Sequence, residues 1–463
     1  MRFTLLLLLT SMVAACDLNQ SHLDRVQDRG ELRVLTRNSA TTYYEGPQGP
    51  TGFEYDLAAG FADYLGVDLK LTIPDSFAEI LRRIAAGEAD LAAAGLTVTR
   101  ARRAVVNFGP VYQKITPQLV YRFGTPAPKN LNDIHGSLEV VAGSSHAERL
   151  RALKEEYPDL VFQENTELES EQLLNLVWEQ VIDYTVADSN EVAINRRYYP
   201  ELRVAFDLNS SESLAWAFPP GDDHSLLDKA RDYFTGLRED GRLEQLLERY
   251  YGHVGEFDYV GTRRYMSHIR QRLPRYRDLF IKAGEETGLD WRLLAAIGYQ
   301  ESHWNPRAVS PTGVRGIMML TQATMKQLGI NKSRHDPEAS ILGGARYIAQ
   351  VKRKIPGRIP EPDRTWMALA AYNVGYGHLE DARILAQRDG ADPDKWVDVK
   401  KYLPLLSQKR WYKQTRHGYA RGREPVRYVE NIRSYYDILV WMTEREREAE
   451  PVSPALSVEL PAL

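Results

Sequence analysis

The hydrophobic pattern of this chain changes character near residues 252–262, and this change constrains the fold more than any other feature of the sequence. Before it, short apolar runs alternate with amphipathic stretches of roughly 10–15 residues. Such alternation is typical of an α/β fold with mostly parallel sheets. After it, strand-like runs nearly vanish and helical periodicity dominates. We therefore expect an α/β domain over residues 30–252 and an all-α domain over residues 262–443.

Each half contains well-defined predicted elements. In the first half, the pattern predicts helices over residues 55–65 and 77–86, and strands over 32–35, 67–73, 89–94, 139–142, 181–186, 204–208 and 215–218. In the second half it predicts helices over residues 275–287, 291–302, 322–328, 339–352, 366–373 and 426–442. Residues 444–463 are first highly charged and then contain prolines, which predicts a disordered tail.

Composition excludes several classes of function. The 59 Lys and Arg residues against 63 Asp and Glu residues leave no basic excess, so nucleic acid is not an expected partner. A single cysteine excludes an intrachain disulfide and a multi-cysteine metal site. His303 and His335 lack the spacing of a helical metal pair. We accordingly predict no metal and no cofactor.

The single cysteine, Cys16, follows a short leader. Arg2 precedes an apolar run over residues 3–13 that is too short to span a bilayer, so residues 1–15 are predicted to be a signal peptide. Cys16 could be the leftover cysteine of a plain secretory peptide. We favour a lipoprotein signal peptide instead. Val13-Ala14-Ala15-Cys16 resembles a bacterial lipobox, in which the cysteine carries the lipid.

The lipobox interpretation implies a location and an anchor. The protein would lie in the bacterial periplasm, held to a membrane through Cys16, with residues 16–29 as a linker. The outer membrane is favoured. Asp17 resembles an inner-membrane retention signal, so the inner membrane stays open.

Three segments of the first half carry a recognisable pattern. They are GFEYDLA at residues 52–58, the stretch 95–112 around Arg102, and residues 140–145, which end in Ser144 and Ser145. On these segments residues 30–252 resemble the family 3 solute-binding domains, periplasmic binders of polar amino acids. The resemblance implies a two-lobed (type II) periplasmic-binding-protein-like fold.

The same resemblance implies a ligand site. Arg102 would bind a ligand carboxylate bidentately, and Ser144 and Ser145 would offer amides at a helix N-terminus. Asp188 would bind the ammonium group. An amino acid or a muropeptide end would provide both charges. The alternative is that Arg102 is a solvated surface charge, as clustered arginines usually are.

Glu301 ends the apolar helix predicted over residues 291–302, before Asn305-Pro306. A partly desolvated carboxyl has a raised pKa and can hold a proton near neutral pH, as a general acid for glycosidic cleavage must. A lone Glu at a helix end is more often a solvated charge. Asp290 lies three turns earlier, too far away to act as a second carboxylate.

The motifs around Glu301 follow a characteristic order. They are Glu301-Ser302, then Asn305-Pro306 with Ser310 and Gly313, Gly316-Ile317-Met318, AYNVG at residues 371–375, and Arg427-Tyr428-Val429. Together they resemble the lytic transglycosylases of the soluble-Slt type, which have a goose-lysozyme-like all-α fold. This chain departs from the family at Met319, where most members have Gln. The fusion of the two halves resembles the membrane-bound lytic murein transglycosylase F group.

The second resemblance implies a reaction on peptidoglycan. The β-1,4 bond between N-acetylmuramic acid and N-acetylglucosamine would be cleaved without water, leaving 1,6-anhydromuramoyl ends. Glu301 would act as acid and then as base, and Tyr372 would form a hydrogen bond near it. The implied substrate-binding residues are Ser302, Ser310, Met318, Tyr372, Asn373 and Tyr428. The structural alternatives are a turn role for Ser310, a core role for Met318, and helix-end bonding for Tyr372 and Asn373.

Two other functions remain open at this point. One is a periplasmic receptor for amino acids or peptides, in which the second half of the chain binds glycan but does not cleave it. The other is a lysozyme-type hydrolase, which differs in using water as the nucleophile. Basic and aromatic residues interleave between Lys409 and Arg433, a pattern that suits anionic polymers. With a secretion signal, the wall polymer is the favoured partner, and a solvated face is the alternative.

Overall fold

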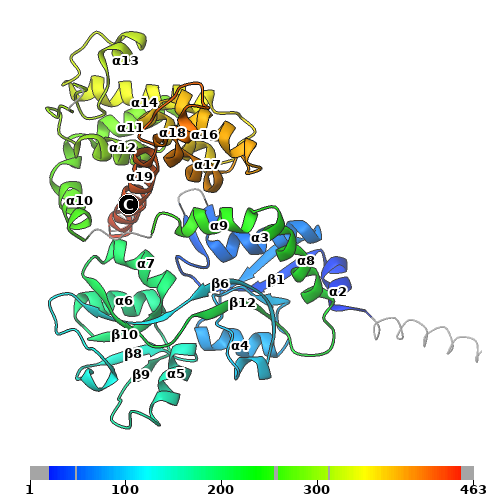
Figure 1. Ribbon diagram of the computed structural model, residues 1–463. Coiled ribbons are helices and arrows are strands. Elements are labelled where there is room, and N and C mark those ends of the chain that lie inside the picture. The colour runs from blue at the N-terminus through cyan, green and yellow to red at the C-terminus, as the bar shows by residue number, and fades with distance from the viewer. Residues whose placement is uncertain (1–19, 47–48, 255–258, 311–312, 450–463) are drawn as a thin grey trace, which may run out of the picture. The chain divides into compact units, whose positions relative to one another are not determined.

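The structure is a computed structural model that describes residues 20–46, 49–254, 259–310 and 313–449. The chain divides into two compact units between residues 257 and 258. The first is a two-lobed α/β unit and the second is helical (Figure 1), which confirms the predicted fold class. The predicted signal peptide, Cys16 and Asp17 lie outside the described residues.

Two five-stranded sheets form the first unit. The first lobe has the order β4-β1-β5-β12-β6, with bounds Asp68–Thr72, Glu31–Leu35, Leu91–Ala92, Glu212–Phe218 and Asn107–Ile115. The second lobe has the order β11-β7-β10-β8-β9, with bounds Leu202–Asp207, Pro117–Arg122, Tyr184–Asp188, Leu138–Val141 and Gln163–Asn165. A separate hairpin pairs β2 (Tyr44–Gly46) with β3 (Gly49–Thr51).

The prediction of mostly parallel sheets was wrong, because both sheets are mixed. β1 pairs in parallel with β4 and β5, but β12 runs antiparallel to β5 and β6. Likewise β8 is parallel to β9 and β10, whereas β7 is antiparallel to β10 and β11. The chain passes between the lobes along β6 and β7, which only Thr116 separates, and returns through β12. We had not predicted β6 and β7 as strands.

Helices cover the sheets of both lobes (Figure 1). In the first lobe they are α2 (His22–Arg29), α3 (Phe53–Leu65), α4 (Phe77–Ala85), α8 (Ser225–Glu239) and α9 (Arg242–Tyr251). In the second lobe they are α5 (Ser145–Leu153), α6 (Ser170–Glu179) and α7 (Ser189–Tyr198). Buried aromatic residues, among them Trp216, Phe61 and Phe234, fill the core of the first lobe.

The segment predicted as the linker is partly folded, which corrects that prediction. Residues 22–29 form α2, which begins at a capping box between Ser21 and Asp24. Val26 is fully buried in the core of the first lobe. The helix forms because its cap satisfies the first amides and its two apolar residues, Leu23 and Val26, pack against that core.

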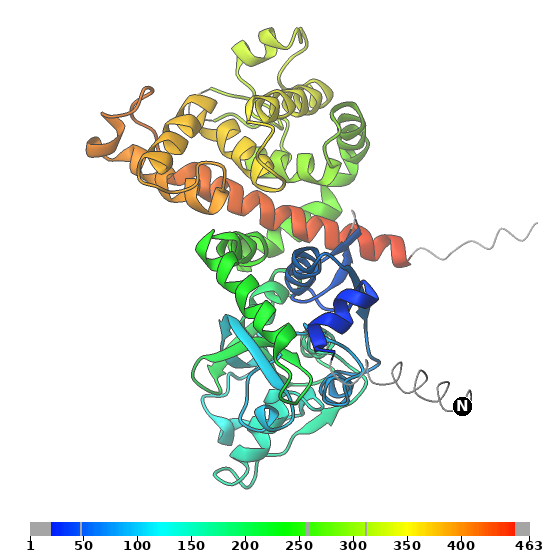
Figure 2. The same ribbon diagram turned by 90° about the vertical axis from the view of Figure 1, so that its right-hand side faces the viewer.

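The second unit is built from helices around α19 (Arg423–Ala449), the long helix visible in Figure 2. α12 (Trp291–Ser302) and α15 (Asp363–Val374) pack against α19. The other helices are α10 (Tyr259–Gln271), α11 (Arg277–Thr287), α13 (Gln322–Gln327), α14 (Pro337–Lys354), α16 (Tyr376–Arg388), α17 (Trp396–Tyr402) and α18 (Lys409–Tyr412). Within the described part of this unit, strand pairing is limited to isolated bridges near residues 309–320.

The end of α19 corrects part of the predicted tail. Residues 444–449 are helical. Arg292 pairs with Glu444 at 3.8 Å and Arg277 with Glu446 at 3.4 Å, so ion pairs continue the helix beyond its apolar stretch. Residues 450–463 lie outside the described residues. Across the described ranges, we find no helix with the length and apolar character needed to cross a bilayer.

Candidate active site and ligand cleft

Glu301 lies one residue before the end of α12. The chain then turns sharply, because His303 and Trp304 both adopt left-handed backbone conformations with φ of 52° and 55°. Trp304 folds back under the helix, is 1% exposed, and its Nε1 donates a hydrogen bond to the Ala295 carbonyl at 2.9 Å. This turn fixes the end of α12 and therefore the position of the Glu301 carboxyl group.

The Glu301 side chain is half-buried, and its carboxyl has one phenol partner. The Tyr428 hydroxyl donates a hydrogen bond to Glu301 Oε1 at 2.6 Å. Burial raises the pKa of Glu301 to about 7, and the hydrogen bond from Tyr428 opposes part of that rise. Burial also raises the pKa of Tyr428 well above 10, so Tyr428 keeps its proton and remains a donor. Glu301 can therefore exist in either protonation state near neutral pH.

The aromatic wall beside Glu301 consists of Tyr372 and Tyr428. Their rings lie nearly parallel, with centroids 6.5 Å apart. We expected Tyr372 to form a hydrogen bond near Glu301. The Tyr372 hydroxyl donates to the Met318 carbonyl at 2.8 Å, and burial and then the nearby Glu301 carboxylate raise the pKa of Tyr372, but Tyr428 is the residue that bonds to the carboxyl itself. Tyr428 comes from α19, so helix packing rather than chain neighbourhood brings it to Glu301.

Hydrogen bonds from Ser302 and Met318 fix the position of the segment 316–318, which lies against α12. Ser302 Oγ donates to the Ile317 carbonyl at 2.9 Å, and the Met318 amide donates to Ser340 Oγ at 3.0 Å. Met318 is fully buried, and its side chain lies against Gly344 so closely that a Cβ there would come within 2.6 Å of it. We had not singled out Ser340, a small polar residue inside an otherwise apolar helix face.

Ser310 and Asn373 are placed differently. The Ser310 amide donates to the Val314 carbonyl at 3.0 Å, and Ser310 Oγ accepts from the Val314 amide at 3.2 Å, so both groups close their own loop. Asn373 is exposed near the end of α15. A substrate role for either residue stays a prediction.

Arg102 lies in the first unit, between the two lobes. It is 2% exposed, which contradicts the alternative of a solvated surface charge. Its Nε donates to Glu148 at 2.9 Å, and its two terminal nitrogens donate to the Thr97 and Gly143 carbonyls at 3.2 and 3.0 Å. Each nitrogen of the guanidinium group therefore already has a partner within the protein.

The other predicted ligand residues also have internal partners. Ser144 caps α5 by accepting from the Ala147 amide, and Ser145 Oγ donates to Thr97 Oγ1 at 3.2 Å. Asp188 Oδ1 lies 2.9 Å from His146 Nε2. These groups, together with Arg102, line a cavity of about 20 Å³. That space holds about one water molecule.

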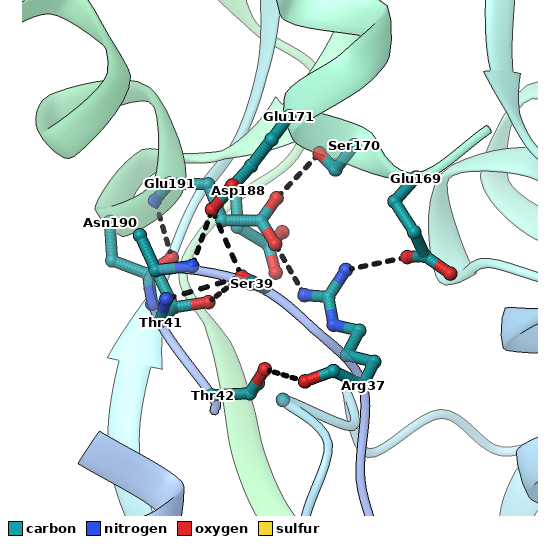
Figure 3. Close-up of polar contacts among 12 residues, drawn as sticks. Arg37, Ser39, Thr41, Thr42, Glu169, Ser170, Glu171, Asp188, Asn190 and Glu191 are labelled. Carbon is teal, nitrogen blue, oxygen red and sulfur yellow. Dashed lines mark hydrogen bonds and ion pairs between the residues drawn. The ribbon is translucent and has the colours of Figure 1, made fainter. Parts of the chain in front are cut away.

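A second ionic cluster, shown in Figure 3, connects the lobes and was missed in the sequence. Arg37, which follows β1, donates to Glu191 of α7 and to Glu169 at 3.3 Å. Glu191 also accepts from Ser170 Oγ at 2.7 Å. Glu171 accepts from the Ala40 amide at 2.7 Å and from Ser39 Oγ. The sequence did offer one signal for Arg37, which is its position just after the predicted strand 32–35. Ligand-site residues gather beyond the carboxyl ends of parallel strands.

Family models match both halves of the chain. The model described as bacterial extracellular solute-binding proteins, family 3, matches residues 32–253, and the transglycosylase SLT domain matches residues 278–395. Tyr428 lies beyond the second match. Among the described residues, no group of three or more His, Cys, Asp or Glu side chains could hold a metal ion.

Curated relatives match nearly the whole chain. Membrane-bound lytic murein transglycosylase F 1 of Alkalilimnicola ehrlichii is 56% identical over 94% of this chain and 88% of its own length. Membrane-bound lytic murein transglycosylase F of Ectopseudomonas mendocina is 50% identical over 96% and 91%. Among solved structures, a mutant of ArgBP from T. maritima covers 50% of this chain and 99% of its own, with 23% identity and a TM-score of 0.45.

Proposed function

The chain belongs to the membrane-bound lytic murein transglycosylase F family and acts as a peptidoglycan lytic transglycosylase, and we propose that Glu301 carries its chemistry. The observation that supports this most is the half-buried carboxyl, bonded to Tyr428, with a pKa of about 7. Such a group holds a proton often enough to donate it and is basic enough to take one back.

In the first step, protonated Glu301 donates its proton to the glycosidic oxygen, and the bond from the muramic acid C1 breaks with its electron pair on the departing O4. In the second, the Glu301 carboxylate removes the proton of the C6 hydroxyl, whose oxygen bonds to C1. A 1,6-anhydro ring closes, Glu301 regains its proton, and no water is consumed. Tyr428 stabilises the carboxylate between the two steps through its hydrogen bond at 2.6 Å.

The surroundings of Glu301 support a single-carboxylate mechanism. Ordinary glycosidases use two carboxyl groups about 5–10 Å apart. Asp290, on the same helix, caps its opposite end and bonds to Arg292 and Tyr436. Mass spectrometry of products from purified peptidoglycan tests the reaction. Muramic acid ends one water lighter than hydrolysis products support it, whereas reducing ends would identify a hydrolase.

We expect Tyr428→Phe to shift the pH dependence of lytic activity. The hydroxyl stabilises the Glu301 carboxylate, so its loss raises the pKa of Glu301 above about 7. The alkaline limb of the kcat/KM profile should move up by about one pH unit, because a hydrogen bond to a charged group contributes about 1.5 kcal/mol. Tyr402→Phe, on α17, is the control. An unchanged limb in Tyr428→Phe would remove Tyr428 from the mechanism.

For the first unit we propose a small zwitterionic ligand, which carries both a carboxylate and an ammonium group. An amino acid or a muropeptide end would be such a ligand, and it would bind in the cleft between the two lobes of this unit. Arg102 and Asp188 would bind it once Glu148 and His146 move aside, because the cavity of about 20 Å³ is too small for an amino acid. A ligand must therefore compete with internal partners that mimic its two charges.

His146→Ala is expected to strengthen this binding by about tenfold, because it frees Asp188 for the ligand ammonium group. Calorimetric titration with soluble muropeptides and with single amino acids measures the change. His135→Ala, at an exposed position, is the control. If the variant and the wild type bound all of these ligands equally, Asp188 would not be the ammonium site.

We further propose that Cys16 is lipidated and holds the enzyme at a membrane facing the periplasm, with the outer membrane favoured. The relatives named as membrane-bound support membrane association. The lipobox-like residues 13–16 support the position of the lipid. Labelling with a fatty acid tests the lipidation, because the label should be found on Cys16. Membrane fractionation tests the location, because the labelled protein should be found in the outer-membrane fraction.

A further inference from the structure

The segment 409–423, KRWYKQTRHGYARGR, contains six Lys and Arg residues and no Asp or Glu. We call it the basic arm. It includes α18 and the loop that leads into α19, in the same unit as Glu301. The chemistry of Glu301 does not explain why so many cations stand together here.

The backbone of the basic arm is held firmly. The amides of Arg416 and His417 both donate to buried Asp381 of α16, at 3.2 and 3.0 Å. The Ala420 amide donates to the Leu406 carbonyl at 3.1 Å. Gly422 packs so tightly that a Cβ there would lie 1.6 Å from the Leu403 carbonyl oxygen. The fold therefore orders this segment and still leaves its long side chains outside.

Most cations of the arm are free to bind something else. Lys409, Lys413, Arg416 and Arg423 are exposed, and none of them pairs with a carboxylate among the residues that the structure describes. Some exposed cations elsewhere in this unit do have carboxylate partners. Lys282 and Lys332 share Glu338, for example, and Arg346 pairs with Glu286. Unpaired like charges on an ordered segment repel one another, so an anionic partner would stabilise them.

Aromatic rings accompany these charges. Tyr412 and Tyr419 form an edge-to-face pair with centroids 5.8 Å apart, and Tyr419 is 57% exposed. The arm ends where α19 begins, and Tyr428 follows Arg423 by an axial rise of about 7.5 Å. Since Tyr428 bonds to Glu301, the arm joins α19 within two helical turns of the residue that contacts the carboxyl.

We propose that the basic arm binds the carboxylates of the stem peptides that branch from the glycan strand, next to the bond that Glu301 cleaves. This inference rests on the proposed function, because it takes peptidoglycan as the substrate. Stem peptides supply carboxylates at regular intervals, which suits several exposed cations better than one buried site. A membrane surface fits less well, because a helical segment that lies in a bilayer interface presents a broad apolar face, whereas the aromatic rings of the arm are few and Trp411 packs against the core of this unit.

The test removes charge from Lys409, Lys413 and Arg416 together, each replaced by Gln in a Glu301→Gln background, so that the polymer stays intact during binding. Co-sedimentation with purified sacculi should show about tenfold weaker binding and a smaller salt dependence, since three exposed ion pairs are lost. With glycan strands stripped of peptides by an amidase, the parent and the triple variant should bind equally. Arg264, Arg270 and Lys326, all exposed in the same unit, give a control with the same change in charge.

Each alternative result has a distinct meaning. Unchanged binding to sacculi, or an equal loss in the control, would overturn the inference. So would a loss confined to vesicles of anionic phospholipid, which would identify a membrane surface. If the triple variant bound sacculi more weakly but the active enzyme released no products from them, the inference would stand and the proposed reaction would fail.

Discussion

Glu301→Gln should lower the rate of anhydromuramoyl product formation by about 10²–10⁴-fold, the usual contribution of a general acid and base. Gln has nearly the shape of Glu but can neither give nor take a proton at the glycosidic oxygen. Its side chain can still accept the hydrogen bond that Tyr428 donates to Glu301 Oε1. Mass spectrometry of products from purified peptidoglycan, over long incubations, measures the loss.

Stability provides the control for this variant. The folded protein holds the Glu301 proton up to about pH 7, whereas an unfolded chain releases it near pH 4.5. The folded state therefore binds the additional proton between these values, and wild-type stability falls as the pH rises through that window. The Gln variant does not titrate, so its melting temperature should increase relative to wild type between pH 5 and pH 8. A rise of this kind excludes misfolding as the cause of inactivity.

The opposite results are equally informative. Full activity in Glu301→Gln would show that another group supplies the proton. Inactivity combined with a lower melting temperature at pH 8 would mean that Glu301 has a structural role. The proposed role of Glu301 in bond cleavage requires that sacculus binding survive the substitution.

Arg37→Met should destabilise the first unit by about 3–5 kcal/mol, because it leaves a buried carboxylate without its counter-ion. Arg37 and Glu191 are 8% and 2% exposed, and they bridge the two lobes. Burial alone would raise the pKa of Glu191, but Arg37 reverses this and holds it below its ordinary value. Without Arg37 the folded state must either keep an unpaired charge or take up a proton.

Scanning calorimetry should show the melting temperature of the first unit falling by about 10 °C, given a domain of this size. Arg82→Met is the matched control, because its side chain is 63% exposed and its ion pair with Glu88 spans 3.7 Å. Arg37→Met combined with Glu191→Gln should recover most of the loss, since the buried charge is gone. If Arg37→Met and Arg82→Met melted alike, the cluster would not hold the lobes together.

Local pattern was a reliable guide to elements with clear ends. The prediction of α12 over residues 291–302 is confirmed exactly, because an apolar helix there begins at the Asp290 cap and ends before Asn305-Pro306. Pattern failed where tertiary pairing decides the structure. β6 and β7 carry half-buried, mixed-polarity residues and become strands through neighbours far along the chain. α2 was missed because its two apolar residues, Leu23 and Val26, are too few to show a clear periodicity.

The sequence by itself made Glu301 the candidate acid, through the order of the motifs around it together with its place at the end of an apolar helix, and the structure gives that carboxyl a raised pKa. It could not identify which tyrosine meets that carboxyl, or that Arg37 bridges the lobes. Those contacts join residues 127 and 154 positions apart. They exist only because helices and lobes pack together, and packing is set by the shapes and volumes of many side chains at once.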